Sequence, residues 1–277
     1  MKNTVVCALA AVAALGLAGN VKAATTVLTP DDLAPKPPAP PTVPAPGDWG
    51  YDNPYGWDWD QDAPLGSTTV GGAPGYSGSS WYSDVQGSAA GGGRDYTSLR
   101  INVQGMFELS SVTMGDLEEI SYWTNLESGT VDWQLKIYTA ENSPGVGSGW
   151  YGHRFNFNTP AFAAGSGWNA SSTDTNLNTN WITDGATSDY TARSLSYLAS
   201  NYGSEEILFI DIIAGYATNS PPVYSYLDGV SLTIGGVTHD LNLEAAVVPL
   251  PGAAALGFLG MGLIGLRRRF QKTHVVA

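Results

Sequence analysis

One segment of this chain, VDWQLKIYT, alternates apolar and polar side chains with a period of two. Successive side chains of an extended strand point to opposite faces, so this alternation predicts a β-strand with one buried face. The apolar residues on that face are Val131, Trp133, Leu135 and Ile137. A second segment, ILFIDII, is apolar at every position except Asp211, which predicts a strand covered on both faces.

Further short segments have the composition of strands: LRINV, FELSSV, ISYWTNL, HRFNF, YLDGVSLTI and VTHDLNL. Clusters of Gly, Pro, Asn and Ser separate them, which is typical of an antiparallel sandwich. One helix is expected in TARSLSYLASNYG, with Asp189 or Thr191 as its N-terminal cap and Gly203 at its end. The body of the chain, residues 76–244, is therefore predicted to be all-β: an antiparallel β-sandwich with one short helix.

The N-terminal residues have the pattern of a secretory signal peptide. Lys2 precedes an uncharged apolar stretch, and the residues around Ala23 suit a signal peptidase that cuts between Ala23 and Ala24. Residues 1–23 are therefore predicted to form a signal helix that is removed from the mature chain. The one cysteine, Cys7, would leave with it, which excludes disulfides and thiol chemistry from the exported part.

The C-terminal residues have the pattern of a membrane-spanning helix. Residues 245–266 carry no charge, and Arg267, Arg268 and Arg269 follow directly. A helix of about 20 apolar residues spans the hydrocarbon core of a bilayer, and the positive-inside rule places the arginines in the cytoplasm. The sequence thus predicts a C-terminal transmembrane helix with the body of the chain exported from the cytoplasm.

Residues 24–75 are predicted to be a proline-rich linker followed by an extension rich in aspartate and aromatic residues. The segment APKPPAPPTVPAP favours an extended polyproline conformation, which acts as a semi-rigid spacer. The later segment DWDQD has the acid spacing of a calcium loop. Ala63 and Thr69 stand where such a loop needs Gly and Glu, so a solvated acidic loop is expected instead.

The exported part, residues 24–246, is strongly acidic. It holds six of the basic residues and all 25 acidic ones, which gives it a net charge of −19. Nucleic-acid binding relies on Lys and Arg side chains that neutralise phosphates. Nucleic acid is therefore excluded as a partner.

The stretch 247–270 resembles the PEP-CTERM sorting signals of Gram-negative bacteria, in the variant that reads Val-Pro-Leu-Pro-Ala, with Gly252 at the final position. The matching residues are Val248, Pro249, Leu250 and Pro251, then Arg267, Arg268 and Arg269. The resemblance implies transient anchoring in the inner membrane and processing by an exosortase, followed by display at the cell surface or release from it. A permanent C-terminal anchor is the alternative.

Within the body, the segments GDLEEISYWTNL, VDWQLKIYT, YGSEEILFIDI and YLDGVSLTI resemble jelly-roll domains and carbohydrate-binding modules. In related sandwiches, the aspartate of the last such strand lies beside a structural cation or in a buried hydrogen-bond network. Here it is Asp228, which falls in phase with Tyr226, Val230 and Leu232. An inward-facing carboxylate must be paired, hydrogen-bonded or metal-bound. The expectation is either a structural calcium at Asp228 or a hydrogen-bonded core residue, with no other cofactor.

Four aromatic residues fall near predicted strand ends or in loops, where a ring could stack on a sugar: Trp150, Tyr151, Trp168 and Trp181. Asn169, Asp184 and His153 are available nearby to hydrogen-bond sugar hydroxyls. Aromatic residues also fill sandwich cores. Each of the four rings is therefore either a ligand-binding residue or a packing residue.

Catalytic motifs are scarce. His153 and His239 are the exported histidines, and neither an H-x-x-x-H nor a G-x-S-x-G motif occurs. A glycosidase needs two carboxylates at a defined separation, and no pair among the 25 acids stands out. The prediction is a non-catalytic, surface-sorted protein of the cell envelope or extracellular matrix that binds exopolysaccharide. The alternatives are an exopolysaccharide-active enzyme and a structural surface protein without a ligand.

Overall fold

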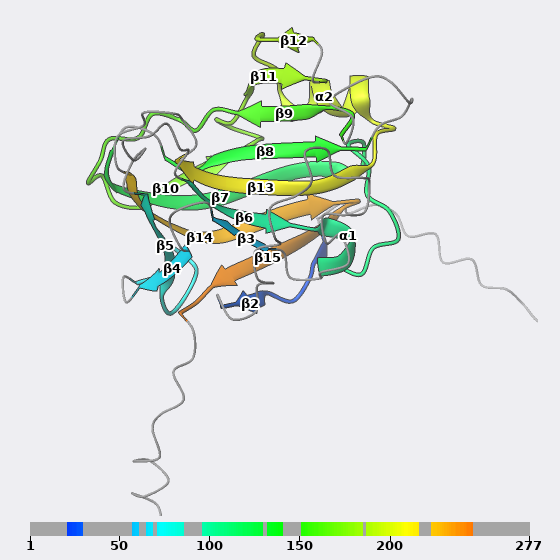
Figure 1. The fold of residues 1–277 in the computed structure, drawn as a ribbon. Helices are drawn as coiled ribbons and strands as arrows, with labels where there is room; N and C mark the ends of the chain where they lie inside the picture. The colour runs from blue at the N-terminus through cyan, green and yellow to red at the C-terminus, as the bar shows by residue number, and fades with distance from the viewer. Residues whose placement is uncertain are drawn as a thin grey trace, which may run out of the picture.

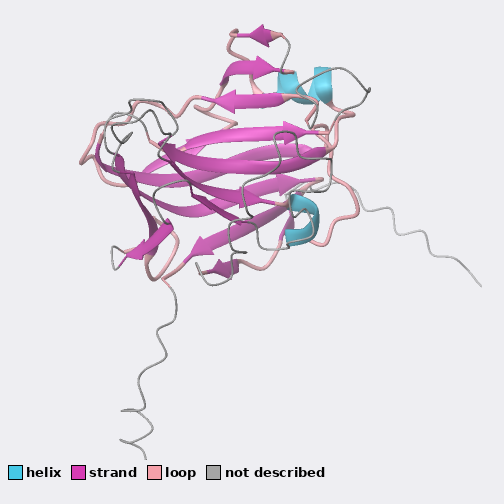
Figure 2. Cartoon of the chain, in the orientation of Figure 1, coloured by secondary structure: helices cyan, strands magenta, loops and turns pink. Residues whose placement is uncertain are grey.

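A computed structural model gives the fold. It describes residues 21–29, 57–60, 65–68, 71–85, 96–129, 132–140, 151–184, 187–215 and 223–245. Two sheets face each other across one hydrophobic core, and the two described helices are short (Figures 1 and 2). The strands are antiparallel except at one edge of the first sheet, where two short strands run parallel to their neighbour. This architecture confirms the predicted all-β sandwich.

The first sheet has eight strands, and its centre is the long strand β14 (Val223–Ile234). On one side β14 pairs along its length with β7 (Leu117–Ser128), which in turn pairs with β10 (Asn169–Ser172). On the other side its first half pairs with β5 (Ser80–Val85) and its second half with β15 (Val237–Leu243). The remaining strands are β4 (Leu65–Thr68) on β5, and β1 (Val21–Lys22) and β2 (Thr26–Leu28), both parallel to β15.

The second sheet has seven strands in the order β12-β11-β9-β8-β13-β6-β3. Their bounds are β12 (Ser188–Asp189), β11 (Thr179–Thr183), β9 (Arg154–Phe157), β8 (Gln134–Thr139), β13 (Ile207–Gly215), β6 (Tyr96–Ile101) and β3 (Trp57–Asp60). All of its neighbouring strands are antiparallel. The sheet thus ends in the short hairpin partner β12 at one edge and in β3 at the other, as Figure 1 shows.

The alternation of apolar residues in the sequence places the core. Trp133, Leu135 and Ile137 are fully buried between the sheets, as predicted for one face of VDWQLKIYT, while Val131 lies outside the described residues. The expectation of a single buried face is wrong, because Lys136 and Tyr138 on the other face are buried as well. Strand β13 is covered on both faces, as predicted: Ile210 and Ile212 belong to the core, while alternate residues such as Phe209 and Asp211 are buried on the opposite face. That opposite face carries the candidate site.

The phase predicted for Asp228 in β14 is wrong. Tyr226 is only partly buried and donates a hydrogen bond to Glu127, whereas Val230 and Leu232 lie in the core. The register of β14 against β7 shifts between Asp228 and Ser231, and Gly229 within that shift has a φ of +59°. A β-bulge adds one residue to a strand and so reverses which face the following side chains occupy. Asp228 therefore shares a face with Tyr226, before the bulge, and not with Val230 and Leu232, after it.

Replacing Gly229 with alanine is expected to lower the unfolding free energy by about 1–3 kcal/mol through backbone strain alone. The new Cβ would also lie 2.4 Å from the ring of Tyr76, which adds a clash. Gly235→Ala is the matched control, because Gly235 has a similar φ of +55° and a Cβ added there would have no atom within 4 Å. Thermal unfolding should therefore show a larger loss for Gly229→Ala. Equal losses would contradict a close contact between Tyr76 and the bulge.

The sandwich begins earlier in the sequence than predicted. Strands β2, β3 and β4 all fall within residues 24–75, which the sequence assigned to a linker and extension, and Leu28 of β2 is fully buried. These strands have three or four residues each and are held by pairing with β15, β6 and β5. Segments this short have too few alternating positions to give a periodic signal.

Two local predictions also need correction. FELSSV is not a strand, because α1 (Val103–Met106) ends there in a turn in which Glu108 has a φ of +55°. The chain turns into α1 because Asn102 caps it, accepting a hydrogen bond from the Gly105 amide. The predicted helix exists as α2 (Leu195–Tyr202), but its cap is Ser194 rather than Asp189 or Thr191. Gly203 follows its last residue, as expected.

The predicted targeting segments lie mostly outside the described residues. This holds for residues 1–20 of the signal peptide, for the proline-rich segment, and for the whole of 247–270. Val21 and Lys22, predicted to be removed with the signal peptide, pair with β15 in the full chain. None of the described helices has the length and apolarity needed to cross a membrane.

Candidate functional site

A row of polar and charged side chains crosses the seven-stranded sheet on the face turned away from the core. The strand register aligns Arg100 of β6, Asp211 of β13, Lys136 of β8, Asn156 of β9 and Trp181 of β11. Their neighbours in sequence face the core, so these residues must face the other way. We call these five residues the charged row. Its first four members are buried.

The end of the charged row opposite Trp181 is rigid. Arg100 donates two hydrogen bonds to Asp211, from Nε to Oδ1 and from a terminal nitrogen to Oδ2, each 2.8 Å long. Both side chains are less than a tenth exposed. The guanidinium group also lies 3.8 Å above the ring of Phe209. A bidentate ion pair stacked on an aromatic ring fixes the guanidinium in position and orientation.

Tyr151, one of the predicted sugar-binding residues, is a packing residue. Its ring meets Tyr138 edge to face at 5.5 Å, and Tyr138 in turn packs on Phe209 at 4.6 Å. Only 6% of Tyr151 is exposed. The three rings form a cluster beside the charged row and present no open ring face for stacking.

Trp181 is placed differently, at the end of the charged row near the sheet edge. Its ring lies 6.1 Å from the ring of Tyr190, and the two planes are within 6° of parallel. The guanidinium of Arg154 lies 4.3 Å from the Trp181 ring. Tyr190 is 73% exposed, the highest value among the large hydrophobic side chains described. We call Arg154, Trp181 and Tyr190 the edge platform.

Tyr190 was not among the residues predicted from the sequence. Strand β12 brings Tyr190 beside Trp181. Asp189 pairs with Ile182 in the antiparallel register, so Tyr190, the residue after Asp189, lies beside Trp181, the residue before Ile182. The Asp184-Gly185 dipeptide between the two strands is a strong hairpin signal. Used as such, it would have predicted the antiparallel pairing that sets these two rings side by side.

The other two predicted tryptophans do not join the edge platform. Trp168 is partly exposed in the loop before β10, which belongs to the eight-stranded sheet. The Asn169 amide there bonds to Ser166 and to the Gly167 carbonyl and so closes the loop. Trp150 lies outside the described residues.

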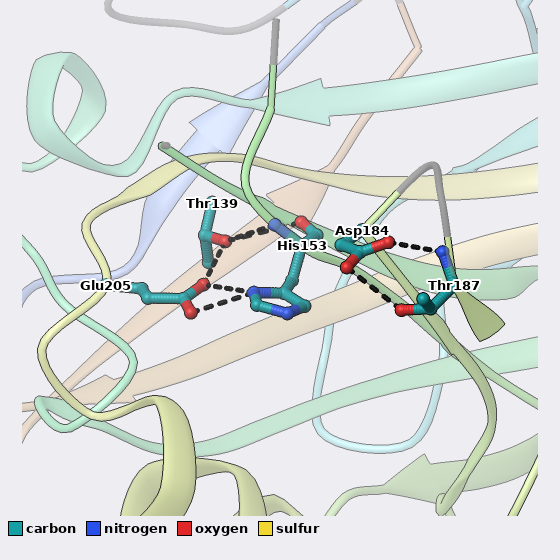
Figure 3. Close-up of polar contacts among 5 residues, drawn as sticks. All are labelled: Thr139, His153, Asp184, Thr187 and Glu205. Atoms are coloured by element: carbon teal, nitrogen blue, oxygen red, sulfur yellow. Dashed lines mark hydrogen bonds and ion pairs between the residues drawn. The ribbon is translucent and has the colours of Figure 1, made fainter. Parts of the chain in front are cut away.

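His153 and Asp184, predicted as hydrogen-bonding partners for sugars, are engaged within the protein (Figure 3). His153 Nδ1 lies 2.8 and 3.0 Å from the two carboxylate oxygens of Glu205. The Thr139 hydroxyl donates to Glu205 and accepts from the His153 amide. Asp184 accepts hydrogen bonds from the amide and hydroxyl of Thr187. Both groups therefore stabilise the ends of strands rather than stand ready for a ligand.

Asp228 lies in a shell of backbone donors. Its Oδ1 accepts from the amides of Gly229 and Leu243, and its Oδ2 accepts from the amide of Ala73, at 2.7–2.9 Å. Burial raises the pKa of this carboxyl. Calcium requires six to eight oxygen ligands, whereas these three partners present N–H groups, and no cluster of three His, Cys, Asp or Glu suits a metal in the described part of the chain. The donor set fits the hydrogen-bonded alternative better than it fits calcium.

A second buried carboxyl, Asp132, lines a cavity of about 150 Å³ at one end of the sandwich. It accepts hydrogen bonds from the hydroxyls of Thr124 and Ser225 and from the Trp133 amide. Burial raises its pKa, which is a property of many catalytic acids. Among the described residues that line this cavity it is the single carboxyl, so the pair that glycoside hydrolysis needs is not assembled there.

Comparison with known proteins adds one structural likeness. No family model matches this chain, and no curated protein sequence matches it. Among solved structures, the family 11 carbohydrate-binding module from Clostridium thermocellum, in complex with a β-1,3-1,4-mixed-linked tetrasaccharide, is similar to it. The alignment covers 69% of this chain and 91% of the module, with 14% identity and a TM-score of 0.37.

Proposed function

We propose that this chain is an exported, surface-sorted, non-catalytic protein that binds polysaccharide through the edge platform. The observation that carries the proposal is the pair of parallel rings, Trp181 and Tyr190, of which Tyr190 is largely exposed. An exposed aromatic pair leaves apolar area in water, and a ligand that covers it gains the free energy of burial. Sugar rings have apolar C–H faces that suit such a surface, and hydroxyls that suit the polar groups beside it.

The surroundings of the platform favour a preformed site. Trp181 stacks with Arg154 on one side, and Asn156 donates a hydrogen bond to the Trp181 carbonyl. The ion pair between Arg100 and Asp211 fixes the opposite end of the same row. A site held by rigid strands loses little conformational entropy when the ligand binds, which increases affinity.

Export and sorting are proposed on the sequence pattern of the two ends. The signal peptide would be cut between Ala23 and Ala24, and the exosortase would recognise the motif 248–251 followed by the arginine cluster 267–269. In this proposal the transmembrane helix holds the protein in the inner membrane until processing. The mature protein then acts in the cell envelope or the extracellular matrix, where the partner is exopolysaccharide.

The protein recovered from the cell surface tests this proposal. Its intact mass should correspond to a chain that starts at Ala24 and lacks residues 267–269. It should also be retarded in native gels that contain soluble polysaccharide of a neutral, uronate or sulfate class, relative to gels without polysaccharide. Recovery of the 267–269 peptide from mature material would contradict sorting by cleavage, and unchanged mobility in every gel would contradict polysaccharide binding.

A further inference from the structure

A cavity of about 450 Å³ lies along the edge of β15, away from the edge platform. The N-terminal segment supplies Lys22 and Thr25 to its lining, the loop before β5 supplies Tyr76, and β15 supplies Asp240 and Asn242. None of the features proposed for polysaccharide binding uses this cavity. Its lining joins the first described residues of the chain to the last strand of the sandwich.

Asp240 is the acidic group of this cavity, and its side chain is only 5% exposed. The ammonium of Lys22 lies 2.5 Å from Oδ2 of Asp240, and among the described residues no other donor forms a hydrogen bond with that oxygen. The Lys22 side chain itself is 66% exposed. A buried carboxylate whose cation is removed keeps its desolvation cost without compensation. Asp240 therefore needs a positive charge at this position.

The expected maturation of the chain removes that cation. Lys22 lies before the predicted cut between Ala23 and Ala24, so the mature chain has no Lys22. The cut creates a new cation instead. Hydrolysis of the peptide bond consumes one water molecule and leaves a carboxylate on Ala23 and an ammonium on Ala24.

The strand register places this new ammonium beside Asp240. The N-terminal segment runs parallel to β15, with Lys22 opposite Thr238 and Thr26 opposite Leu241. Ala24 lies midway between them and is thus level with the residues just before Leu241. Lys22 pairs with Thr238, two residues before Asp240, and its ammonium nevertheless reaches Asp240. A strand rises about 3.3 Å per residue, so the backbone of Ala24, two residues after Lys22, already lies at the level that the Lys22 ammonium reaches.

We propose that signal-peptide cleavage exchanges the cation at Asp240, so that the α-ammonium of Ala24 replaces the Lys22 ammonium and anchors the mature N-terminus in this cavity. The inference rests on the proposed export and goes beyond it, since it assigns a binding site for the product of cleavage. In the uncut chain the Ala23 amide bonds to the Thr238 carbonyl, which holds the scissile segment on the sheet edge. Strand β2 stays paired with β15 after the cut and keeps Ala24 in place.

The environment of the cavity favours a cation. Burial, together with the negative charges of Asp240 and Asp228, raises the pKa of Tyr76 to about 12. Asn242 also lines the cavity, and its amide oxygen is buried without a hydrogen-bond donor among the described residues. An ammonium group offers three N–H donors, which suits two acceptor side chains on one face of β15. Ala24 itself is exposed, so water and reagents reach its amine.

The test uses the chain 24–277 in detergent, released from an N-terminal fusion so that Ala24 carries a free amine. The pH dependence of its acylation, read from the N-terminal peptide, gives the acid dissociation constant of the α-amine. An ion pair with Asp240 is expected to lower that constant about threefold, and Asp240→Asn should restore it. The matched control is Asp174→Asn, an exposed acid in a turn, which should leave it unchanged.

A second measurement serves if Asp240→Asn does not fold. The dissociation constant in the folded wild-type chain should be about threefold lower than in the same chain in urea. Equal constants in the folded and unfolded chains would overturn the proposed anchor. N-terminal sequencing of surface material is separate from this test: a start other than Ala24 would overturn the cleavage, while the acylation data decide the anchor.

Discussion

Truncating Asp228 to alanine is expected to lower the unfolding free energy by roughly 3 kcal/mol or more. The carboxylate accepts hydrogen bonds from three backbone amides, of Ala73, Gly229 and Leu243, and all three bonds are buried. Each buried N–H left without an acceptor costs about 1–3 kcal/mol. Because these amides belong to three separate segments, their loss should loosen the loop before β5 and the end of β15 together. Chemical denaturation measures the effect.

Asp228→Asn is the comparison variant: it keeps one acceptor oxygen, removes the charge, and places an NH2 group where the second oxygen accepts an amide hydrogen bond. Burial raises the pKa of Asp228 in the folded chain, so its contribution to stability is largest below the unfolded pKa and is lost as the pH rises through the folded pKa. The penalty of Asp228→Asn relative to wild type should therefore shrink as the pH rises from the acid range toward neutrality. A fall in melting temperature on chelation, reversed by calcium, would contradict the hydrogen-bonded account and support a bound ion.

Replacing Arg100 with methionine is expected to cost about 3–5 kcal/mol, because it leaves the buried Asp211 carboxylate without its bidentate partner. The double replacement Arg100→Met with Asp211→Leu removes both charges and fills the space with apolar atoms. Such replacements of buried ion pairs are often neutral or stabilising. The double variant should therefore recover most of the loss in a denaturant titration.

The comparison between these two variants separates charge from packing. If Arg100→Met alone costs less than about 1 kcal/mol, the pair behaves like a surface ion pair. The charged row would then lack a rigid end at β6 and β13. If the double variant is as unstable as the single one, the stacking of Arg100 on Phe209 matters more than the ion pair.

The strands with long periodic patterns could be predicted from the sequence. β8 and β13 carry enough apolar positions to reveal both the strand and the face that packs in the core. The burial of the polar face of β8 could not be predicted, because it depends on what packs over that face. β2, β3 and β4 could not be predicted, because they are three or four residues long and exist through pairing with distant strands. Their partners are fixed by the tertiary fold and leave no mark in the local sequence.

The candidate site was predicted only in part. Trp181 was identified as a loop-proximal aromatic residue, but its partner Tyr190 depends on the register of the short hairpin strand β12. The orientation of Asp228 depends on the bulge at Gly229, which a simple two-residue period does not anticipate. The contact between Lys22 and Asp240 joins residues more than 200 positions apart, so local patterns contain no sign of it.

The most direct test of polysaccharide binding is the affinity of a double variant, Trp181→Ala with Tyr190→Ala, for the polysaccharide that retards the wild-type protein. Tyr226→Ala is the control, because Tyr226 is also a partly exposed tyrosine in a ring pair, with Tyr82 at 5.1 Å, but lies on the other sheet. Isothermal titration should show affinity at least about tenfold weaker for the double variant, about 1.4 kcal/mol, and near wild type for Tyr226→Ala. Wild-type affinity in the double variant, with an unchanged fold, would contradict binding at the edge platform.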